Sequence, residues 1–426
     1  MKIKGLLKGE EVKNAGWLIG GKIFQMLLSL LVSILTARYL GPDNFGLINY
    51  GNTYVAFFTA ICNLGINSVI IKEFIDHKDE QGEAIGTALL MRFVSSVLSA
   101  LMIIGIVGVV DHDEPLTIAV VALCSLGLIF HIFETINFWF QAQYKSKITA
   151  IATLVAYALT SAYKVILLAM GKSVQWFAFA TSIDYILIAV FLLVAYKKYR
   201  GPKLSVSFKK GKALLSVSSH YILSGMMVAV YGHTDRLMLK HMTSQASVGY
   251  YSVAFSVCTM WTFVLQAVID SVYPTILRLH GADKQAFEKK NRQLYAIVFY
   301  LSTFVSLAFF IFGDFGIRLL FGEEYAPSAN ILKIATWYTA FSYLGVARNA
   351  WIVSEGKQKY LKYLCLMAAL LNICLNALLI PFMGAMGAAL ASLISEVSVS
   401  MLIPLIFKDM RPNVRLMIQG IMLKKL

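Results

Sequence analysis

Residues 37–50 read ARYLGPDNFGLINY and separate two runs that carry almost no charge, FQMLLSLLVSIL at 24–35 and NTYVAFFTAICNLGI at 52–66. The residues at 41–44, GPDN, have the composition of a tight turn, because glycine permits a left-handed backbone, proline presets φ, and Asp and Asn accept local hydrogen bonds. Arg38 is followed by a tyrosine, a pair that suits the membrane–water interface. The stretch therefore predicts a hairpin that joins two membrane-spanning helices.

The composition of the chain excludes a water-soluble globule. Of its 426 residues, 58% are hydrophobic and 14% are charged, whereas a soluble domain carries about 25% charged residues. The start of the chain has no small-residue cleavage site, so we expect a cytoplasmic tail rather than a cleaved signal peptide. The cysteines lie in apolar runs without metal-type spacing, which predicts neither disulfides nor a zinc site: Cys62, Cys124, Cys258, Cys365 and Cys374.

Twelve stretches are long and apolar enough to cross the hydrocarbon core, which takes about 20 residues of helix. They cover residues 14–36, 46–70, 84–110, 115–140, 148–170, 174–196, 213–234, 248–274, 293–313, 328–354, 361–381 and 384–407. Their continuous apolar character excludes a porin-type barrel, in whose strands apolar and polar residues alternate. We therefore expect an all-α polytopic membrane protein.

The distribution of lysine and arginine sets the orientation of these helices, since cytoplasmic loops carry an excess of both. Of the 38 lysine and arginine residues, 28 fall on the side that holds the N-terminal tail, five on the opposite side and five within the spans. Both termini are therefore expected in the cytoplasm, and the hairpin at 37–50 outside. Most of the net charge of +15 then belongs to membrane topology rather than to nucleic-acid binding.

A basic segment, KKYRGPKLSVSFKKGK at 197–212, divides the chain into an N-terminal lobe, 1–196, and a C-terminal lobe, 213–426. Each lobe then holds six expected spans. Such a segment is typical of a cytoplasmic loop beside anionic lipid, and a specific lipid-headgroup or regulatory site is the alternative.

The two lobes repeat one another weakly in sequence. Gly46 in FGLINY aligns with Gly249 in VGYYSV, and Trp139 in WFQAQYKSK aligns with Trp351 in WIVSEGKQK. Because six spans leave both lobes in the same orientation, the repeat is expected to be parallel, related by an axis along the membrane normal. A substrate path through a central cavity between two such lobes predicts a transporter that works by alternating access.

Five cations lie inside the expected spans: Lys22, Arg92, Lys164, Lys333 and Arg348. A charge at bilayer depth costs about 2.5–3.5 kcal/mol on insertion scales and usually faces a cavity or a partner. Arg92 and Lys333 lie near span ends, where snorkelling to the interface is an alternative, whereas the apolar neighbours of Lys164 and Arg348 favour a cavity. A cavity lined with cations suits an anionic substrate such as a phosphate or pyrophosphate. Structural ion pairing between helices is the other interpretation.

Four carboxylates accompany these cations within the spans: Glu134, Asp184, Asp270 and Glu396. Asp184 and Glu396 take matching places in the last span of each lobe. Asp270 lies just before Pro274, which is expected to break its helix. The carboxylates are candidates for carrying H⁺ or Na⁺ in coupled transport, and interhelical pairing explains them equally well.

Motifs for catalysis are weak. GKS at 171–173 lacks the first glycine of a phosphate-binding loop, since that position is Ile166. DHDE at 111–114 ends at Pro115 in a tight outer turn, and the short outer loops hold no catalytic acidic pair. We therefore expect no enzyme, no cofactor and no bound metal.

Several motifs together resemble the Wzx-type polysaccharide flippases of the multidrug/oligosaccharidyl-lipid/polysaccharide exporter superfamily. The resemblance covers about residues 13–407 and rests on GGKIFQMLLSLLVSILTARYLGPDNFGLINY (20–50), LGINSVIIKEF (64–74), WFQAQYKSK (139–147), TDRLMLKHMTSQASVGYYSVA (234–254), FGEEYAPSANILKI (321–334) and LNICLNALLIPFMGAMGAALASLISE (371–396). It implies translocation of undecaprenyl-diphosphate-linked oligosaccharide units across the bacterial cytoplasmic membrane, for O-antigen, capsule or a similar surface polysaccharide.

The resemblance also implies two six-helix lobes around a cationic cavity, through which the diphosphate and sugars cross while the isoprenoid tail stays in lipid. Diphosphate contacts are then expected first from Lys22, Lys164 and Arg348, and next from Arg92 and Lys333. The implied partners are the lipid-linked oligosaccharide, membrane lipids, and the polysaccharide polymerase and export machinery, with no nucleic acid.

Three other functions are alternatives. A cation-coupled multidrug exporter of the same superfamily would need acidic and aromatic residues in its cavity. A membrane glycosyltransferase or polymerase would need a catalytic acidic pair in an outer loop. A non-catalytic scaffold for the assembly machinery would tolerate the loss of charge at Lys164 and Arg348.

Overall fold

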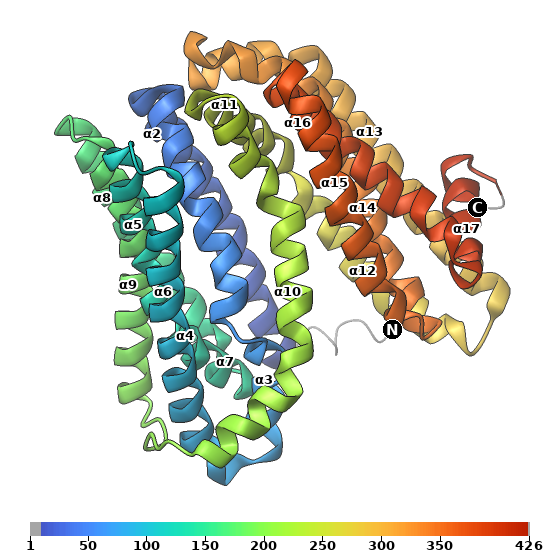
Figure 1. Cartoon of the computed structure of the whole chain (residues 1–426). Coiled ribbons are helices and arrows are strands. Elements are labelled where there is room, and N and C mark those ends of the chain that lie inside the picture. The colour runs from blue at the N-terminus through green and yellow to red at the C-terminus, as the bar shows by residue number, and fades with distance from the viewer. Residues whose placement is uncertain (1–9, 425–426) are drawn as a thin grey trace. The chain divides into compact units, whose positions relative to one another are not determined.

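In the computed structural model, residues 10–424 are described, apart from the side chains of 10–19, 21–23, 68, 220, 223 and 224. Every regular element in this part of the chain is a helix (Figure 1). The all-α fold expected from the continuous apolar runs is confirmed.

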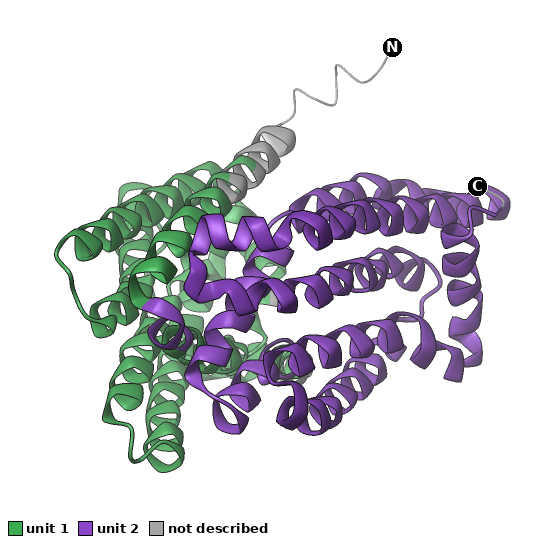
Figure 2. Cartoon of the chain, turned by 90° about the horizontal axis from the view of Figure 1, so that it is seen from above, with its two compact units in different colours: residues 1–40, 47–229 green, residues 41–46, 230–426 purple. Residues whose placement is uncertain are grey.

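The chain forms two compact units, coloured separately in Figure 2. Unit 1 comprises residues up to 40 and residues 47–229, and unit 2 comprises residues 41–46 and 230–426. The division between them falls inside one long helix, α10 (Phe208–Met242). The two lobes expected on either side of the basic segment at 197–212 stay a prediction.

Unit 1 is built on a central helix, α9, which packs against α5, α6 and α8. Its elements are most of α2 (Glu10–Cys62), η1 (Ile66–Ser68), α3 (Ile70–Asp76), η2 (Lys78–Glu80), α4 (Gln81–Val110), α5 (Pro115–Ser125), α6 (Gly127–His131), α7 (Glu134–Ala142), α8 (Ser146–Ala169), α9 (Val174–Lys198) and the first part of α10. Its apolar core lies around α3, α4 and α7, and includes Trp139.

Unit 2 is built on α14, which packs against α11, α12, α13 and α16. Its elements after α10 are α11 (Gln245–Thr259), α12 (Thr262–His280), α13 (Lys284–Phe321), η3 (Glu323–Tyr325), α14 (Ala326–Ser354), η4 (Gln358–Tyr360), α15 (Leu361–Met383), α16 (Ala385–Val397), η5 (Ser398–Leu402), η6 (Ile403–Ile406), η7 (Lys408–Met410) and α17 (Arg411–Ile421). Its core includes Trp351, the residue that the sequence repeat pairs with Trp139.

All twelve expected spans fall on helices of the described part of the chain. Among residues 10–424, eight helices have the length and hydropathy of a membrane span, or nine if the bent pair α11 and α12 counts as one. The two arms of α2 correspond to two expected spans, but they form a single helix among these eight. Neither α10 nor α14 reaches the same hydropathy, because both carry many polar residues. The chain is a multi-pass membrane protein.

Helix α4 shows how these units meet lipid. Its outward side chains are large and apolar, since Leu101 is 62% and Val109 is 78% exposed. Its inward side chains are polar or small and recur with helical spacing at Arg92, Ser96 and Ser99, all of which are buried. Apolar residues outside and polar or small residues inside are typical of helices that pack within a bilayer.

The stretch at 37–50 forms the bend in α2. Gly41 has φ 72° and ψ 172°, a backbone that side chains rarely permit, and Pro42 begins the second arm. On the first arm the Tyr39 hydroxyl donates to the carbonyl oxygen of Lys172 at 3.1 Å. The turn expected from the sequence is thus made by the backbone of one residue, Gly41.

Two glycines let the segment at 41–46 pack closely inside unit 2. A Cβ built on Gly46 would lie 2.0 Å from the carbonyl oxygen of Gln245, and one built on Gly249 would lie 2.2 Å from that of Pro42. Real Cβ atoms do not approach backbone oxygens so closely. The two residues that the sequence repeat pairs therefore face one another across a direct backbone contact.

The basic segment between α9 and α10 packs against the start of α4. The backbone N–H of Ser205 donates to the carbonyl oxygen of Gly82 at 3.3 Å. Lys210 Nζ lies 2.5 Å from a carboxylate oxygen of Glu73 and 2.5 Å from one of Glu80. These contacts anchor the segment to unit 1.

Four expected spans are interrupted. The stretch at 46–70 leaves α2 after Cys62 and continues through a turn and η1 to Ile70. The stretch at 115–140 breaks at Leu126 and again between α6 and α7, and the stretch at 248–274 bends by 41° between α11 and α12. The stretch at 384–407 passes from α16 into η5, a π-helical turn. Each interruption leaves backbone groups without their usual helical partners.

One expectation about a helix end was wrong. Pro274 does not break its helix but lies inside α12, which continues to His280; membrane helices tolerate proline where neighbours satisfy the freed backbone group. Beyond the last expected span, α17 packs against α13. Helix α17 has 11 residues and both polar and apolar faces, so it is too short and too polar to be recognised as a membrane span.

We expect Gly46→Ala to destabilise the protein by about 1–3 kcal/mol, because the new methyl group would clash with a backbone oxygen that cannot move cheaply. Thermal unfolding of the purified protein in one detergent measures the change. Gly105→Ala is the matched control, since a Cβ at Gly105 meets nothing within 4 Å. Equal apparent Tm values for the two variants would contradict the close contact.

Candidate functional site

Unit 1 holds a polar cavity of about 440 Å³ lined by residues of α2, α6, α7, α8 and α9. Its polar lining consists of amides, hydroxyls, one imidazole and one carboxylate: Gln25, His131, Glu134, Asn137, Gln141, Thr149, Thr153 and Tyr185. Phe130 and Phe138 add aromatic rings. A cavity of this size with a few convergent polar groups is typical of a ligand-binding site.

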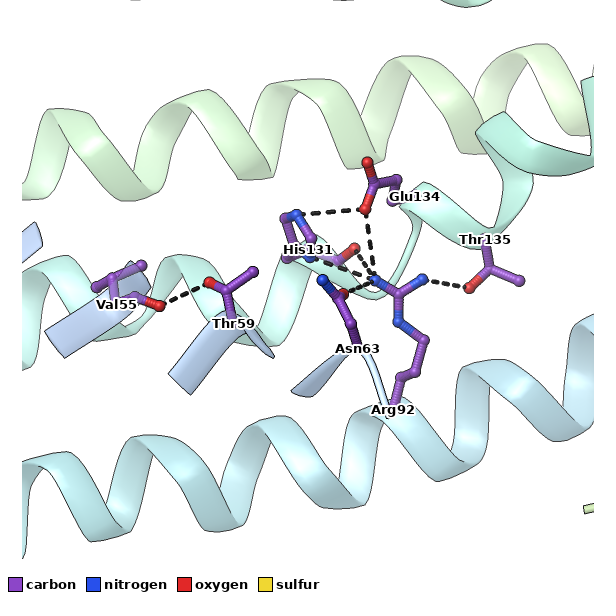
Figure 3. A network of polar contacts seen from close by, with 7 residues as sticks. All are labelled: Val55, Thr59, Asn63, Arg92, His131, Glu134 and Thr135. Carbon is purple, nitrogen blue, oxygen red and sulfur yellow. Dashed lines mark hydrogen bonds and ion pairs between the residues drawn. The ribbon is translucent and has the colours of Figure 1, made fainter. Parts of the chain in front are cut away.

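Arg92 is held beside this cavity by a network of polar contacts (Figure 3). Its side chain, 1% exposed, reaches from α4 toward the junction of α6 and α7. Nη1 donates to Thr135 Oγ1 at 2.9 Å, and Nη2 donates to Asn63 Oδ1 at 2.6 Å. Nη2 also lies 3.3 Å from His131 Nδ1 and 3.6 Å from Glu134 Oε2. These donors are committed to protein acceptors.

The break between α6 and α7 explains part of this arrangement. The backbone N–H of Thr135 donates to Ile132 rather than to His131, so the carbonyl oxygen of His131 lacks its helical partner. Arg92 Nη2 lies 3.4 Å from that oxygen. The guanidinium thus supplies a donor to a backbone oxygen that the broken helix leaves without its usual one.

Glu134 connects this network to the cavity. One carboxylate oxygen lies 3.6 Å from Arg92 Nη2 and 3.4 Å from His131 Nε2. The side chain is one-third exposed and belongs to the cavity lining. Glu134 therefore offers a cavity ligand a hydrogen-bond acceptor whose charge Arg92 partly balances.

Lys164 and Asp184 lie on the neighbouring helices α8 and α9. Lys164 interacts electrostatically with the Asp184 carboxylate, and both side chains are half-buried. One carboxylate oxygen of Asp184 is buried without a hydrogen-bond partner among the described residues. Lys22 lies in α2, but its side chain is outside the described residues.

Arg348 has a structural environment in unit 2 that parallels that of Arg92. Its side chain is 4% exposed, and Nη1 donates to the carbonyl oxygens of Val399 at 2.9 Å and Ser400 at 3.3 Å. Both carbonyls belong to the π-helical turn η5. Arg348 also interacts electrostatically with Glu396, so the structure brings these two expected site residues together.

Of the expected residues of unit 2, Glu396 lies near Arg348, whereas Asp270 and Lys333 belong to neither pair. Glu396 is 5% exposed, and the hydroxyls of Tyr231, Tyr338 and Ser342 surround its carboxylate. Asp270 is exposed on α12 and accepts a hydrogen bond from Gln266 at 2.8 Å. Lys333 is half-buried on α14.

Asp235 is a buried carboxylate that the sequence interpretation did not select. It is 5% exposed on α10. Asn376 Nδ2 donates to its Oδ1 at 2.5 Å, Ser392 Oγ donates to its Oδ2 at 2.7 Å, and the Tyr251 hydroxyl donates to Oδ2. A cavity of about 240 Å³ opens onto this group, with Asn372 in its lining.

The signal for Asp235 was present but weak. The residue is followed by Arg236 at an expected outer helix end, where an acidic and a basic residue are typical of a surface. Asn372 and Asn376 are spaced by one helical turn on α15, which places both amides on one face of an apolar helix. Nothing in the sequence brings that face to Asp235.

The chain belongs to the polysaccharide biosynthesis protein family, because the sequence profile of that family matches residues 12–280. The profile of the MatE family matches residues 221–378. Among curated proteins, the chain is similar to the capsular polysaccharide biosynthesis protein CapF of Staphylococcus aureus, with 21% identity over 396 residues, covering 90% of this chain and 96% of CapF. It is also similar to a putative O-antigen transporter of Shigella flexneri, with 20% identity, covering 89% of this chain and 93% of the transporter.

Solved structures share the fold. A MATE-family multidrug resistance transporter of the MOP superfamily, in an inward-facing conformation, matches with a TM-score of 0.69 and 13% identity, over 92% of this chain and 94% of that one. The lipid II flippase MurJ, in an inward closed conformation, matches with a TM-score of 0.67 and 14% identity, over 95% and 91%. The resemblance to polysaccharide flippases of the exporter superfamily is confirmed, and with it a membrane transporter in polysaccharide biosynthesis.

We expect Arg92→Gln to destabilise the protein by about 1–3 kcal/mol, because the loss of the guanidinium leaves the buried acceptors Thr135 Oγ1 and Asn63 Oδ1 without their donor. Thermal unfolding in a single detergent measures the loss. Arg318→Gln is the matched control, since Arg318 is 42% exposed and its surface ion pairs contribute about 0–1 kcal/mol. If Arg92→Gln unfolds at the same temperature as Arg318→Gln, the network does not stabilise unit 1.

Proposed function

We propose that the protein is a flippase that moves undecaprenyl-diphosphate-linked oligosaccharide units across the bacterial cytoplasmic membrane by alternating access, with both termini in the cytoplasm. The observation that carries this proposal is the polar cavity of unit 1 inside helices whose outer faces are apolar. Such an arrangement separates a polar passenger from lipid while an isoprenoid tail stays in the bilayer. The names of the relatives CapF and the O-antigen transporter agree with a surface polysaccharide as the product.

The lining of the cavity suits a sugar. Side-chain amides and hydroxyls donate and accept hydrogen bonds at once, as sugar hydroxyls require, and Asn137, Gln141 and Thr153 supply them here. The ring of Phe138 offers a flat apolar surface for the C–H face of a pyranose. Glu134 adds an acceptor that is stronger than a neutral oxygen.

The diphosphate needs cations whose donors are available. Arg92 and Arg348 already donate to protein acceptors, so we assign them to positioning within the proposed site. Lys164 and Lys333 are half-buried and have no hydrogen bond to another described residue, so these two are the first candidates for phosphate contacts. Lys22, whose side chain is outside the described residues, stays a further candidate. A lysine ammonium binds phosphate as a point charge.

Ion coupling in this proposal rests on buried carboxylates, and Asp235 is the strongest candidate. Its cage is made of oxygen-bearing groups, and the Asn376 amide oxygen is buried without a partner among the described residues. Carboxylate, amide and hydroxyl oxygens are ligands for hard cations such as Na⁺, and the same carboxylate accepts H⁺. Glu134, Asp184, Asp270 and Glu396 stay further candidates.

A cation-coupled multidrug exporter is the second candidate function. The MatE profile on residues 221–378 and the fold of a multidrug transporter favour it. An organic cation would be attracted to Glu134 and the aromatic rings of the cavity. The two functions differ in the charge of the passenger, so one assay with both passengers separates them.

Gln141→Leu should lower transport of a lipid-linked oligosaccharide by about 2- to 10-fold, because one net hydrogen bond to the sugar is lost. Proteoliposomes that carry a fluorescent lipid-linked saccharide, scored by access to an external quencher, measure the rate. Gln358→Leu, at an exposed position of η4, is the matched control. Transport of a quaternary ammonium dye without transport of the saccharide would favour the exporter instead.

Asp235→Asn should remove the acceleration of transport by an ion gradient, because the amide is similar in shape but carries no charge. The measurement compares flipping with and without Na⁺ and H⁺ gradients in the same proteoliposomes. Asp113→Asn, at a side chain 85% exposed, is the matched control. Flipping by the unaltered protein that is indifferent to collapse of every gradient would end the coupling hypothesis.

A further inference from the structure

Unit 2 contains a second, larger cavity that the proposed transport function does not use. Its volume is about 1380 Å³, and its walls come from the end of α12, the start of α13, the end of α14, η7 and α17. The distribution of lysine and arginine assigns all these chain segments to the cytoplasmic side. The cavity therefore opens where the headgroups of the inner leaflet are expected.

Every carboxylate in the wall of this cavity already has a partner. Asp283 caps the start of α13 and accepts from a backbone N–H at 3.0 Å. The remaining pairs are Glu288 with Arg292 at 3.5 Å, Glu355 with His280 at 3.3 Å, and Asp409 with Lys357 at 3.1 Å. The Tyr360 hydroxyl and Lys357 hold the pKa of Asp409 below its usual range, so that carboxylate stays ionised and paired.

The cations of the same wall outnumber these carboxylates. Among residues 10–424, no carboxylate lies within ion-pair distance of Lys284, Lys289, Lys408 or Arg415, all of which are exposed. Arg411 is also exposed, and its Nε donates only to the carbonyl oxygen of Leu405, at 2.9 Å. Five cationic side chains therefore surround the cavity without an anion to balance them.

Helix α17 is fixed on α13 by contacts that do not involve these cations. Val414 and Met417 of α17 are buried. Asn413 Nδ2 donates to the Tyr295 hydroxyl at 2.7 Å. Because α17 is anchored in this way, its exposed face has a defined direction.

The exposed face of α17 changes from cationic to apolar along its length. Arg411, Arg415, Ile418 and Met422 recur at helical spacing and are all exposed, with Met422 directly following the helix. A soluble phosphate would use only the cationic end. A phospholipid has both an anionic headgroup and acyl chains, and it matches both ends of this face.

We propose that this cavity binds the phosphate headgroup of an anionic phospholipid of the cytoplasmic leaflet, with an acyl chain along Ile418 and Met422. Lys408, Arg411 and Arg415 contact the phosphate from one wall, and Lys284 and Lys289 contact it from the other. The site belongs to unit 2, shares no lining residue with the cavity of unit 1, and does not depend on what the protein transports.

Native mass spectrometry of the full chain in detergent tests the proposal, with phosphatidylglycerol titrated against phosphatidylcholine. The combined variant Lys408→Gln, Arg411→Gln, Arg415→Gln should bind phosphatidylglycerol at least about tenfold more weakly, because each Lys or Arg near an anionic headgroup contributes to the attraction. The control variant Lys197→Gln, Lys198→Gln, Lys203→Gln removes the same charge from another cytoplasmic segment and should retain binding. Equal losses in the two variants would overturn the site in favour of general surface charge.

Two further arms distinguish the sources of the anion. Inorganic phosphate and an acidic peptide are titrated separately, and neither should raise the apparent Tm as phosphatidylglycerol does. Stabilisation by phosphate alone, or by the peptide without the lipid, would overturn the phospholipid assignment. If the combined variant does not fold, Arg415→Gln replaces it, because no hydrogen bond or ion pair joins Arg415 to another described side chain. Unchanged phosphatidylglycerol binding by Arg415→Gln would count against the site.

Discussion

Arg92 is the interaction on which the cavity of unit 1 depends. A membrane helix that breaks between α6 and α7 exposes backbone oxygens that hydrocarbon cannot solvate, and the guanidinium of Arg92 supplies donors for them and for the side chains around them. The break in turn directs Glu134 into the cavity. Arg348 satisfies the π-helical turn of unit 2 in the same manner. Buried arginines thus permit irregular helices, and irregular helices make polar cavities possible in an apolar unit.

Much of the fold could be predicted from the sequence, because long apolar runs and an excess of cytoplasmic lysine and arginine have few physical interpretations. The bend at Gly41 was expected, since glycine followed by proline leaves the chain little choice. The break between α6 and α7 was not expected, because an apolar run contains no local signal for it; the partner that stabilises the break, Arg92, lies more than 30 residues away in sequence.

The sequence predicted which charged residues belong to the candidate site better than it predicted which of them lie close to one another. Charges in apolar spans pointed to Arg92, Glu134, Arg348 and Glu396, and the structure places the first two in one network and the last two near each other. Whether a buried cation faces a ligand or a backbone oxygen depends on tertiary contacts that composition does not contain. Asp235 was missed for the same reason, since its cage comes from three other helices.

The contact between Gly46 and Gly249 has a consequence for exchanging parts between relatives. Residues 41–46 belong to unit 2 although the chain on both sides of them belongs to unit 1. A hybrid joined at the basic segment would take these six residues from one parent and the helix they pack against from the other. The hybrid would fold only if both parents have glycine at the positions equivalent to Gly46 and Gly249. The two repeats therefore have to be exchanged together, because neither half can be exchanged alone.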